Sequence, residues 1–438
     1  MKRKVYFLCS PSLGILDNWL PIINSMRYLE KNLEFVLIFP KAETVRQINN
    51  KSILINMSEN IFDYVIYRLD SGLWAQSNSL LEVKDNIGPL DGFISFLINL
   101  KLRLQTYKWL NYLMILIIRV YKLFDRYRYK SIFFDINSLS YNPSLLLYDL
   151  YEEGKPYNKD VLIHLSKSKK YSIYHGIGID EFQRESRCDS IKSRENLKAY
   201  LFSSFEIDYY KRTFCLEESH LSVVGIPRHD ENWLEKMHTA FNYNDFIFKK
   251  DEYILIISRP LCSYITAERR KEALEYIKKI VIENLGLKIV IKLHPKEDKS
   301  KIYEEVFGIS EYEKKWVYSS RHPLALGENC KFAISFFSGV VIDMMRLGVP
   351  SIEYLDLKDL DGHDNKNSLR DGEYPIFGYR HLGFVYGASN FQQLEFNINK
   401  IINNRSVVNQ ELVEKYKKYF PVNNNVSNEI AKEMLLSL

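Results

Sequence analysis

The sequence predicts an α/β protein with two doubly wound domains that face each other across a cleft. Short apolar runs alternate with helical stretches up to Val224, and the same alternation starts again at Tyr253. This pattern is typical of parallel strands joined by crossover helices. The 438 residues are more than one hydrophobic core usually supports, and they suit two. Sheets of this kind bind ligands at the carboxyl ends of their strands.

The N-terminal domain is expected to span residues 1–240, with a helical insertion at about residues 90–130. Each of its expected strands is a short apolar run bounded by polar turns or by a helical stretch. The expected strands are Val5–Cys9, Leu33–Phe39, Ser52–Ile55, Tyr64–Tyr67, Ser131–Asp135, Tyr171–Tyr174, Ala199–Phe202 and Leu221–Val224.

The C-terminal domain is expected to span residues 241–405, and the helices of residues 406–438 are expected to pack back toward the N-terminal domain. Its strands alternate with helices in the same way. The expected strands are Tyr253–Ile257, Leu287–Lys292, Trp316–Tyr318, Phe332–Ser335 and Ser351–Tyr354.

The composition argues against some classes of partner. A net charge of +5 on 60 basic and 55 acidic side chains is too small for a nucleic-acid-binding surface. The longest apolar run, Leu110–Ile118, is far shorter than the ~20 residues that span a bilayer. The five cysteines form no CxxC pair, and we expect them to be reduced thiols in a cytoplasmic protein.

The segment Phe93–Tyr129 mixes apolar and basic side chains in a long helical pattern. One interpretation is a helical hairpin packed on the sheet. The other is a peripheral contact with the anionic inner face of the bacterial inner membrane. A flotation assay with anionic vesicles distinguishes them, because only the second surface would bind the vesicles.

The first motif with chemical meaning runs from Lys288 to Glu297. An apolar strand delivers Lys292 and His294 to its carboxyl end, and Pro295 stops the strand. A histidine there can donate to a phosphate oxygen or protonate a leaving phosphate, and the lysine adds positive charge. A second pair, His322-Pro323, lies in a loop and is set aside.

The second motif is the turn after the strand that ends at Ser335. Ser338 is placed to cap the next helix, whose first amides form an anion site. Gly339 lets a phosphate approach the backbone. The next expected strand contains Glu353, which we expect to be a partner for ribose hydroxyls.

Together these motifs resemble bacterial GT-B glycosyltransferases of surface-polysaccharide synthesis. The pattern is shared by transferases of 3-deoxy-manno-octulosonate (Kdo), by sialyl- and polysialyltransferase-like enzymes, and by glycerophosphotransferases of teichoic-acid synthesis. The resemblance covers about residues 253–354, and Phe337 stands where many members have a serine. It implies that His294, Pro295, Ser338 and Gly339 hold the donor's cytidine and phosphate. The complete expected donor set is Ser258, Arg259, Lys292, His294, Pro295, Ser335, Ser338, Gly339 and Glu353.

The resemblance implies a metal-independent transferase that moves Kdo or a sialic-acid-like nonulosonate from a CMP-activated donor. The acceptor would be a surface polysaccharide, such as capsule or O-antigen, or a lipid-linked glycan. The alternatives are a CDP-glycerol or CDP-ribitol phosphotransferase, a UDP-sugar transferase, and a non-catalytic subunit that binds a glycan or a nucleotide.

The reacting groups are expected on the N-terminal domain. Asp135 follows a wholly apolar run, where a charge is costly unless it is used or capped. We expect it to be the principal carboxylate, assisted by Asp70 or by His175, which also follow predicted strands. The alternative for both aspartates is a turn or helix cap. No metal site is expected, because the nine histidines are scattered and the acidic run Asp359–Asp364 suits a solvated loop.

Overall fold

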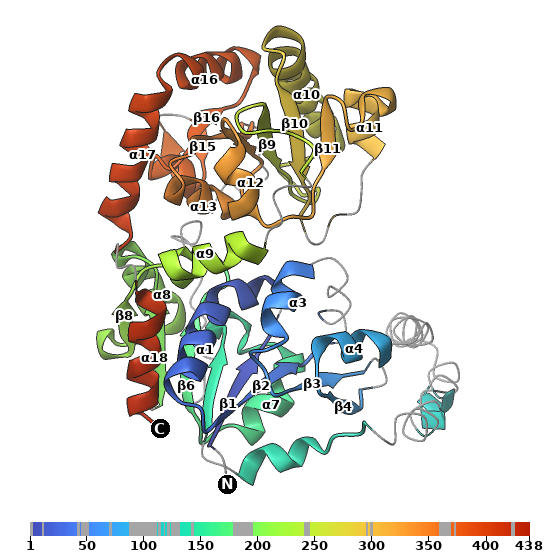
Figure 1. Ribbon diagram of the computed structural model, residues 1–438, viewed down its shortest axis with the longest axis vertical. Coiled ribbons are helices and arrows are strands. Elements are labelled where there is room, and N and C mark those ends of the chain that lie inside the picture. The colour runs from blue at the N-terminus through green and yellow to red at the C-terminus, as the bar shows by residue number, and fades with distance from the viewer. Residues whose placement is uncertain are drawn as a thin grey trace.

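The computed structural model confirms two α/β domains, each built on a parallel sheet (Figure 1). It describes residues 3–10, 13–41, 44, 52–69, 72–86, 132–141, 144–177, 196–240, 246–294, 297, 301–358, 369–371, 374–421 and 425–438, and single positions between 112 and 123. Asp70 and Pro295 of the expected site lie outside these residues.

The N-terminal sheet has eight strands in the order β4-β3-β2-β1-β5-β6-β7-β8. All neighbours are parallel except β3 and β4. The chain leaves β1 in one direction and returns to β5 on its other side, so the carboxyl ends of β1 and β5 form a switch point where ligands bind in such sheets. The bounds are β1 (Arg3–Leu8), β2 (Leu33–Phe39), β3 (Tyr64–Arg68), β4 (Trp74–Ser77), β5 (Ser144–Tyr148), β6 (Lys169–Ile173), β7 (Leu197–Leu201) and β8 (Leu221–Val223).

The C-terminal sheet has six parallel strands in the order β11-β10-β9-β12-β13-β16. Its switch point lies between β9 and β12, and a small antiparallel pair, β14 (Leu369–Asp371) and β15 (Tyr374–Ile376), lies outside it. The bounds are β9 (Tyr253–Ile257), β10 (Lys288–Lys292), β11 (Trp316–Tyr318), β12 (Ala333–Ser335), β13 (Ser351–Tyr354) and β16 (Tyr386–Ala388).

Helices cover the sheets, and their buried faces complete the cores. In the N-terminal half they are α1 (Leu16–Leu29), α3 (Ser52–Ser58), α4 (Leu80–Asn86), α7 (Lys159–His164), α8 (Ile207–Phe214) and α9 (Glu231–Ala240). In the C-terminal half they are α10 (Ala267–Ile277), α11 (Lys301–Phe307), α12 (Pro323–Asn329), α13 (Val340–Arg346), α15 (Gly378–His381), α16 (Phe391–Asn403), α17 (Arg405–Tyr419) and α18 (Val426–Leu436).

The end of the chain crosses back between the domains. Helix α17 contacts α13 of the C-terminal domain, whereas α18 packs on α1 of the N-terminal domain (Figure 1). Close backbone approach makes this crossing tight, because a Cβ on Gly225 would lie 2.8 Å from the carbonyl oxygen of Pro421. Gly225 also has a φ of 95°, which other residues rarely adopt. The exact domain boundaries remain a proposal.

Two expected strands are wrong, and five strands of the structure, β4, β5, β14, β15 and β16, were not expected. Ser52–Ser58 is helix α3, and Ser131–Asp135 contributes only an isolated bridge between Phe133 and Ala75. Of the missed strands, β5 lies at the centre of its sheet, and it is a leucine-rich run with weak strand propensity. This exchange matters for the site, because β5 and not 131–135 lies beside β1.

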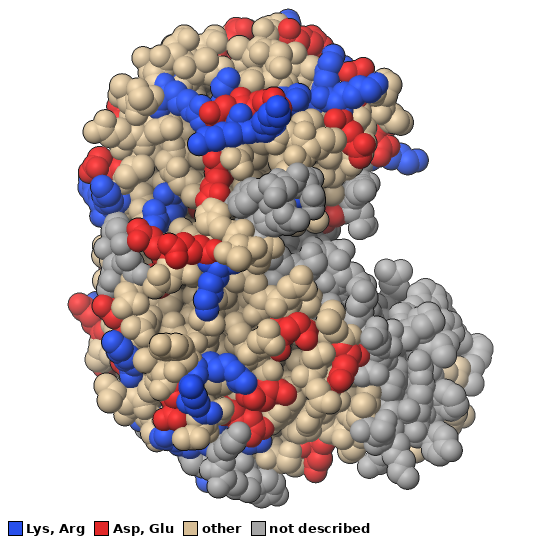
Figure 2. All heavy atoms as spheres, in the orientation of Figure 1, with Lys and Arg blue, Asp and Glu red and all other residues tan. Residues whose placement is uncertain are grey.

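Cys215 is disulfide-bonded, so the expectation that all five cysteines are reduced is wrong for this residue. Among the described residues, no helix is long and apolar enough to span a membrane. Most of Phe93–Tyr129 lies outside the described residues. On the face drawn in Figure 2, basic and acidic side chains are interspersed over both domains.

Candidate active site

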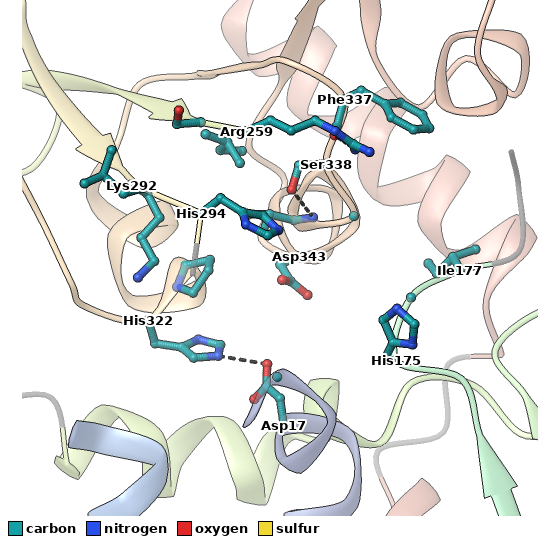
Figure 3. A pocket seen from close by; sticks show the side chains of 18 of the residues that line it. Asp17, His175, Ile177, Arg259, Lys292, His294, His322, Phe337, Ser338 and Asp343 are labelled. Atoms are coloured by element: carbon teal, nitrogen blue, oxygen red, sulfur yellow. Dashed lines mark hydrogen bonds and ion pairs between the residues drawn. The ribbon is translucent and has the colours of Figure 1, made fainter. Parts of the chain in front are cut away.

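A cleft of about 390 Å³ lies between the two domains, at the carboxyl ends of both sheets. Side chains from both domains line it and point toward one another (Figure 3). Asp17 and His175 come from the N-terminal domain, and Arg259, His294 and Ser338 come from the C-terminal domain. The cleft therefore gathers residues that the sequence analysis placed on opposite walls.

On the C-terminal wall, His294 follows β10 and is held by the loop behind it. The backbone N–H of Glu297 donates to the carbonyl of His294 at 2.9 Å. The Glu297 carboxylate accepts from the Ser258 hydroxyl at 2.6 Å and from the buried Arg270 guanidinium at 2.5 Å. Ser258 lines the cleft, yet its hydroxyl is committed to this support, which fixes the position of His294.

The turn after β12 forms the other part of this wall. Phe337 has a φ of 69°, a strained conformation that bulky residues adopt where structure around them imposes it. The Arg259 guanidinium donates to the Phe337 carbonyl at 2.7 Å and lies 5.0 Å from the centre of its ring. Arg259 therefore holds the turn, and its expected pairing with a donor phosphate stays a prediction.

The turn presents Ser338 and Gly339 to the cleft ahead of α13. Gly339 is the N-cap of the helix, and the Ser338 hydroxyl accepts a long 3.4 Å bond from the amide of Val340 (Figure 3). The capping role expected for Ser338 is thus weak. Lys292 also lines the cleft, where its Nζ donates to the Ser320 carbonyl at 3.1 Å.

On the N-terminal wall, His175 is paired with Asp149. These residues follow the neighbouring parallel strands β6 and β5, so their side chains meet at one edge of the sheet. The Asp149 carboxylate bonds to Nδ1 of His175 and also accepts from the His175 backbone amide at 3.2 Å. The Asp149 side chain is 1% exposed, whereas that of His175 is 32% exposed in the cleft.

This pairing orients the imidazole. A buried carboxylate on Nδ1 fixes that nitrogen as the donor and directs Nε2 away from Asp149. Tyr174 packs edge-on against the ring at 4.6 Å and limits its rotation. The arrangement is that of a general base held by a carboxylate. The sequence analysis identified His175 but missed Asp149, because it missed β5.

The floor of the cleft contains the set-aside His322. Its Nε2 donates to Asp17 at 2.9 Å, and its Nδ1 accepts from the amide of Leu324 as the cap of α12. Burial opposes the charged form of Asp17, but His322 and then Arg228 hold the pKa of Asp17 below its ordinary value.

Behind the floor, Arg228 joins the domains. It donates to Asp343 of α13 at 2.9 Å and to Asn18 of α1, and it is almost fully buried. His229 donates to the same Asp343 oxygen at 2.7 Å and accepts from Tyr416 of α17. The only sequence signal for this cluster was the Gly-Ile-Pro-Arg-His-Asp run after β8.

The pKa shifts in this cluster follow from burial and from these partners. Burial lowers the pKa of His229 to about 4, so the ring is neutral at pH 7. For Asp343, burial favours the neutral form, but Arg228 and His229 outweigh it and hold its pKa well below the ordinary value. Asp343 is therefore a buried carboxylate whose charge Arg228 compensates.

Several expected site residues do not reach the cleft. Asp135 is exposed at the outer edge of the N-terminal sheet, where its carboxylate accepts from the backbone of Asn137 at 3.1 Å. It caps a turn, which was the alternative interpretation. Ser335 and Glu353 are neighbours on β12 and β13, buried beneath the sheet edge and not among the residues that line the cleft.

The buried Glu353 carboxyl is expected to make the stability of the protein depend on pH. Burial raises its pKa to about 7, although Arg380 and Arg259 oppose the shift. A raised folded-state pKa means that the stability is fully present below the unfolded value, about 4.3, and is lost as the pH rises through 7. We therefore expect Glu353→Gln to resemble the wild type at pH 4 and to be more stable at pH 8 by up to ~3 kcal/mol. Urea denaturation at both pH values measures this, and an equal difference at both would contradict it.

Within the described part of the chain, no group of three or more His, Cys, Asp or Glu side chains is placed to hold a metal ion. The acidic run Asp359–Asp364 lies outside that part.

Comparison with known proteins shows which solved structures share this fold. No protein-family profile and no curated protein matches the sequence. Among solved structures, UDP-GlcNAc 2-epimerase from Methanocaldococcus jannaschii, in complex with UDP-GlcNAc and UDP, is 14% identical with a TM-score of 0.53 over 100% of both chains. The epimerase from Neisseria meningitidis bound to UDP-GlcNAc is 14% identical with a TM-score of 0.51 over 100% of both chains.

The wall teichoic acid polymerase TagF is 12% identical, with a TM-score of 0.52 over 100% of this chain and 89% of its own. These identities are too low to transfer an activity, but the likeness extends over the whole chain. The protein therefore has the GT-B-like fold shared by the nucleotide-sugar epimerases and this polymerase.

Proposed function

We propose that this protein transfers a group from a nucleotide-activated donor to a hydroxyl of an acceptor, with His175 as general base. The observation that carries the proposal is the His175–Asp149 pair, which faces His294 and Ser338 across the cleft (Figure 3). One wall thus offers a base for a hydroxyl, and the other offers donors for a phosphate.

The donor side is supported by the chemistry of the C-terminal wall. His294 and Lys292 carry N–H groups that suit phosphate oxygens. The turn at Ser338 and Gly339 brings backbone amides to the same region. In this proposal, His294 stabilises the departing nucleotide as negative charge develops on its phosphate.

The described acids that line the cleft favour a base over a carboxylate nucleophile. These are Asp17 and Asp343, and each is engaged by a histidine or an arginine. A retaining glycosyl transfer through a covalent intermediate needs a carboxylate at the reacting carbon. Direct attack by a hydroxyl needs only a base, which His175 supplies.

Direct attack suits a CDP-activated alditol phosphate, such as CDP-glycerol or CDP-ribitol, and we favour this donor. The acceptor oxygen attacks the alditol-bearing phosphorus, His175 takes the hydroxyl proton, and CMP leaves with the electrons of the broken P–O bond. The full-length likeness to TagF agrees with this choice. Inverting transfer of an acidic sugar from a CMP donor to a surface glycan is the second candidate, because the same two walls and the Lys-x-His-Pro motif fit it.

The test is a thermal-shift screen of the purified protein against CMP, CDP, UMP, UDP and GDP. A nucleotide at about 100 times its Kd stabilises the folded state by about 2.7 kcal/mol. We expect the cytidine nucleotides to stabilise the protein and His294→Ala to lose this effect. The exposed His381 gives the matched control, since His381→Ala should keep it.

The pattern of binding then selects the donor for turnover assays. Release of CMP from CDP-glycerol or CDP-ribitol supports the phosphotransferase, and release from CMP-Kdo or CMP-sialic acid supports the glycosyltransferase. Preference for UDP would move the proposal to UDP-sugar chemistry, including epimerisation. If none of the five nucleotides binds, the proposed function is wrong, and a glycan-binding subunit becomes the hypothesis to test.

A further inference from the structure

A second pocket, separate from the cleft, lies on the flank of the C-terminal domain. It has a volume of about 290 Å³ and is lined by Glu304, Ile309, Tyr312, Trp316 and Tyr318. We call it the flank pocket. Its lining residues come from α11, from the segment after it and from β11, which is the edge strand of the C-terminal sheet. Figure 1 labels both elements. None of its lining residues lines the cleft.

The aromatic part of the flank pocket is rigid. Trp316 is fully buried, and its Nε1 donates to the carbonyl of Gly308 at 2.8 Å. Tyr312 and Tyr318 pack edge-on against it, with ring centres at 5.0 Å and 5.2 Å. Tyr303 supports Tyr318 from behind at 5.9 Å. The two half-buried tyrosines are thus fixed before any ligand arrives.

The remaining polar wall is the carboxylate of Glu304. This side chain is half-buried, and no described residue forms a hydrogen bond or an ion pair with it. Two lysines that follow the pocket residue Tyr312 in the chain have other partners, since Lys315 pairs with Glu311 at 3.4 Å and Lys314 donates to the Ser310 carbonyl at 3.1 Å. Burial and then the charge of Glu304 raise the pKa of Tyr318.

A carboxylate without a partner between aromatic rings selects a cation. The faces of tyrosine rings attract cations that have been stripped of water. A primary ammonium would need three hydrogen-bond acceptors, and losing its water without them is costly. A trimethylammonium group has no N–H that needs a hydrogen-bond acceptor, and it presents methyl groups to Ile309 and the rings. It still carries the positive charge that would pair with the Glu304 carboxylate.

We propose that the flank pocket binds a trimethylammonium group, as found in choline. The pocket lies close to the cleft in the chain, because β11 ends at Tyr318 and Ser320 lines the cleft. A choline substituent on an acceptor could therefore be held beside the reacting site. That use rests on the proposed function, whereas the binding itself does not.

The test compares choline with 3,3-dimethylbutan-1-ol, which has the same shape and no charge, by ligand-observed NMR on the full chain. We expect choline to bind and the neutral compound to bind at least about tenfold more weakly. Glu304→Gln keeps the shape of the wall and should weaken choline by a similar factor. Glu305→Gln is the matched control, because Glu305 is exposed on the same helix and does not line the pocket.

Equal binding of the two compounds, or of choline to both glutamine variants, would overturn the proposal and leave only an apolar groove. Absence of choline binding would overturn it as well. Tyr318→Leu gives an independent check, since it removes a ring and leaves the carboxylate, and it should also weaken choline. Nucleotide stabilisation in the same samples reports on the cleft separately, so a failure of the flank pocket and a failure of the proposed function can be told apart.

Discussion

Replacing His175 by asparagine is expected to lower the turnover number by about 10²–10⁴, the usual contribution of a general base. The donor KM and the stabilisation by nucleotide should stay close to wild type, because His175 lies on the wall opposite His294. Asparagine retains an N–H near the position of Nδ1, so the bond to the Asp149 carboxylate can persist. Steady-state kinetics with the donor selected by the nucleotide screen measure this.

Asp149→Asn should cost a large part of the same factor, since it removes the buried charge that orients the imidazole. It should also change the pH profile of turnover, which a purely structural defect would not do. His381→Asn is the matched control, as an exposed histidine outside the cleft. If His175→Asn keeps more than about a tenth of the wild-type turnover, His175 is not the base.

The sequence predicted Asp135 as the principal carboxylate, whereas the proposed function uses Asp149 to orient His175. An acid at the end of a wholly apolar strand is costly unless it is used or capped. Asp149 fits this description, because it follows β5 and is buried. The sequence pointed to Asp135 instead, because the run before it has phenylalanine and isoleucine, the stronger strand formers. The strand that ends at a buried acid was misassigned, and a catalytic role for either aspartate stays a prediction.

The C-terminal wall was easier to predict than the N-terminal wall, for a physical reason. His294 and Ser338 each follow a strand within one local motif, so the sequence nearby is enough to place them at the sheet edge. The pairing of His175 with Asp149 depends on which strands are neighbours in the sheet. The local pattern of apolar residues predicts a strand but does not predict the order of strands in the sheet.

The contacts between the domains could not be predicted from the sequence for the same reason. Arg228 and Asp343 are far apart in the chain, and neither stands in a repeating pattern. A polar residue at a strand end can also hold its own loop, as Arg259 and Ser258 do, and local sequence does not reveal such partners. Position at a sheet edge is therefore predictable, but the partner of each side chain is not.

Arg228→Met is expected to destabilise the protein by about 3–5 kcal/mol, the usual result of removing one partner of a buried ion pair. Methionine keeps much of the volume of the side chain but removes the guanidinium that compensates Asp343. The side chains of this pair are only 10% and 5% exposed, so water cannot replace the lost partner. Urea denaturation at pH 7 measures the loss.

The control is Lys417→Ala, which breaks the exposed pair of Lys417 and Glu414 and should cost no more than about 0.5 kcal/mol. A double-variant cycle tests the mechanism, because Asp343→Leu removes the charge that Arg228→Met leaves uncompensated. The double variant should lose clearly less stability than the sum of the two single variants. Strict additivity would show that Arg228 stabilises the fold through its packing alone, and that the charge pair does not join α13 to the segment between the domains.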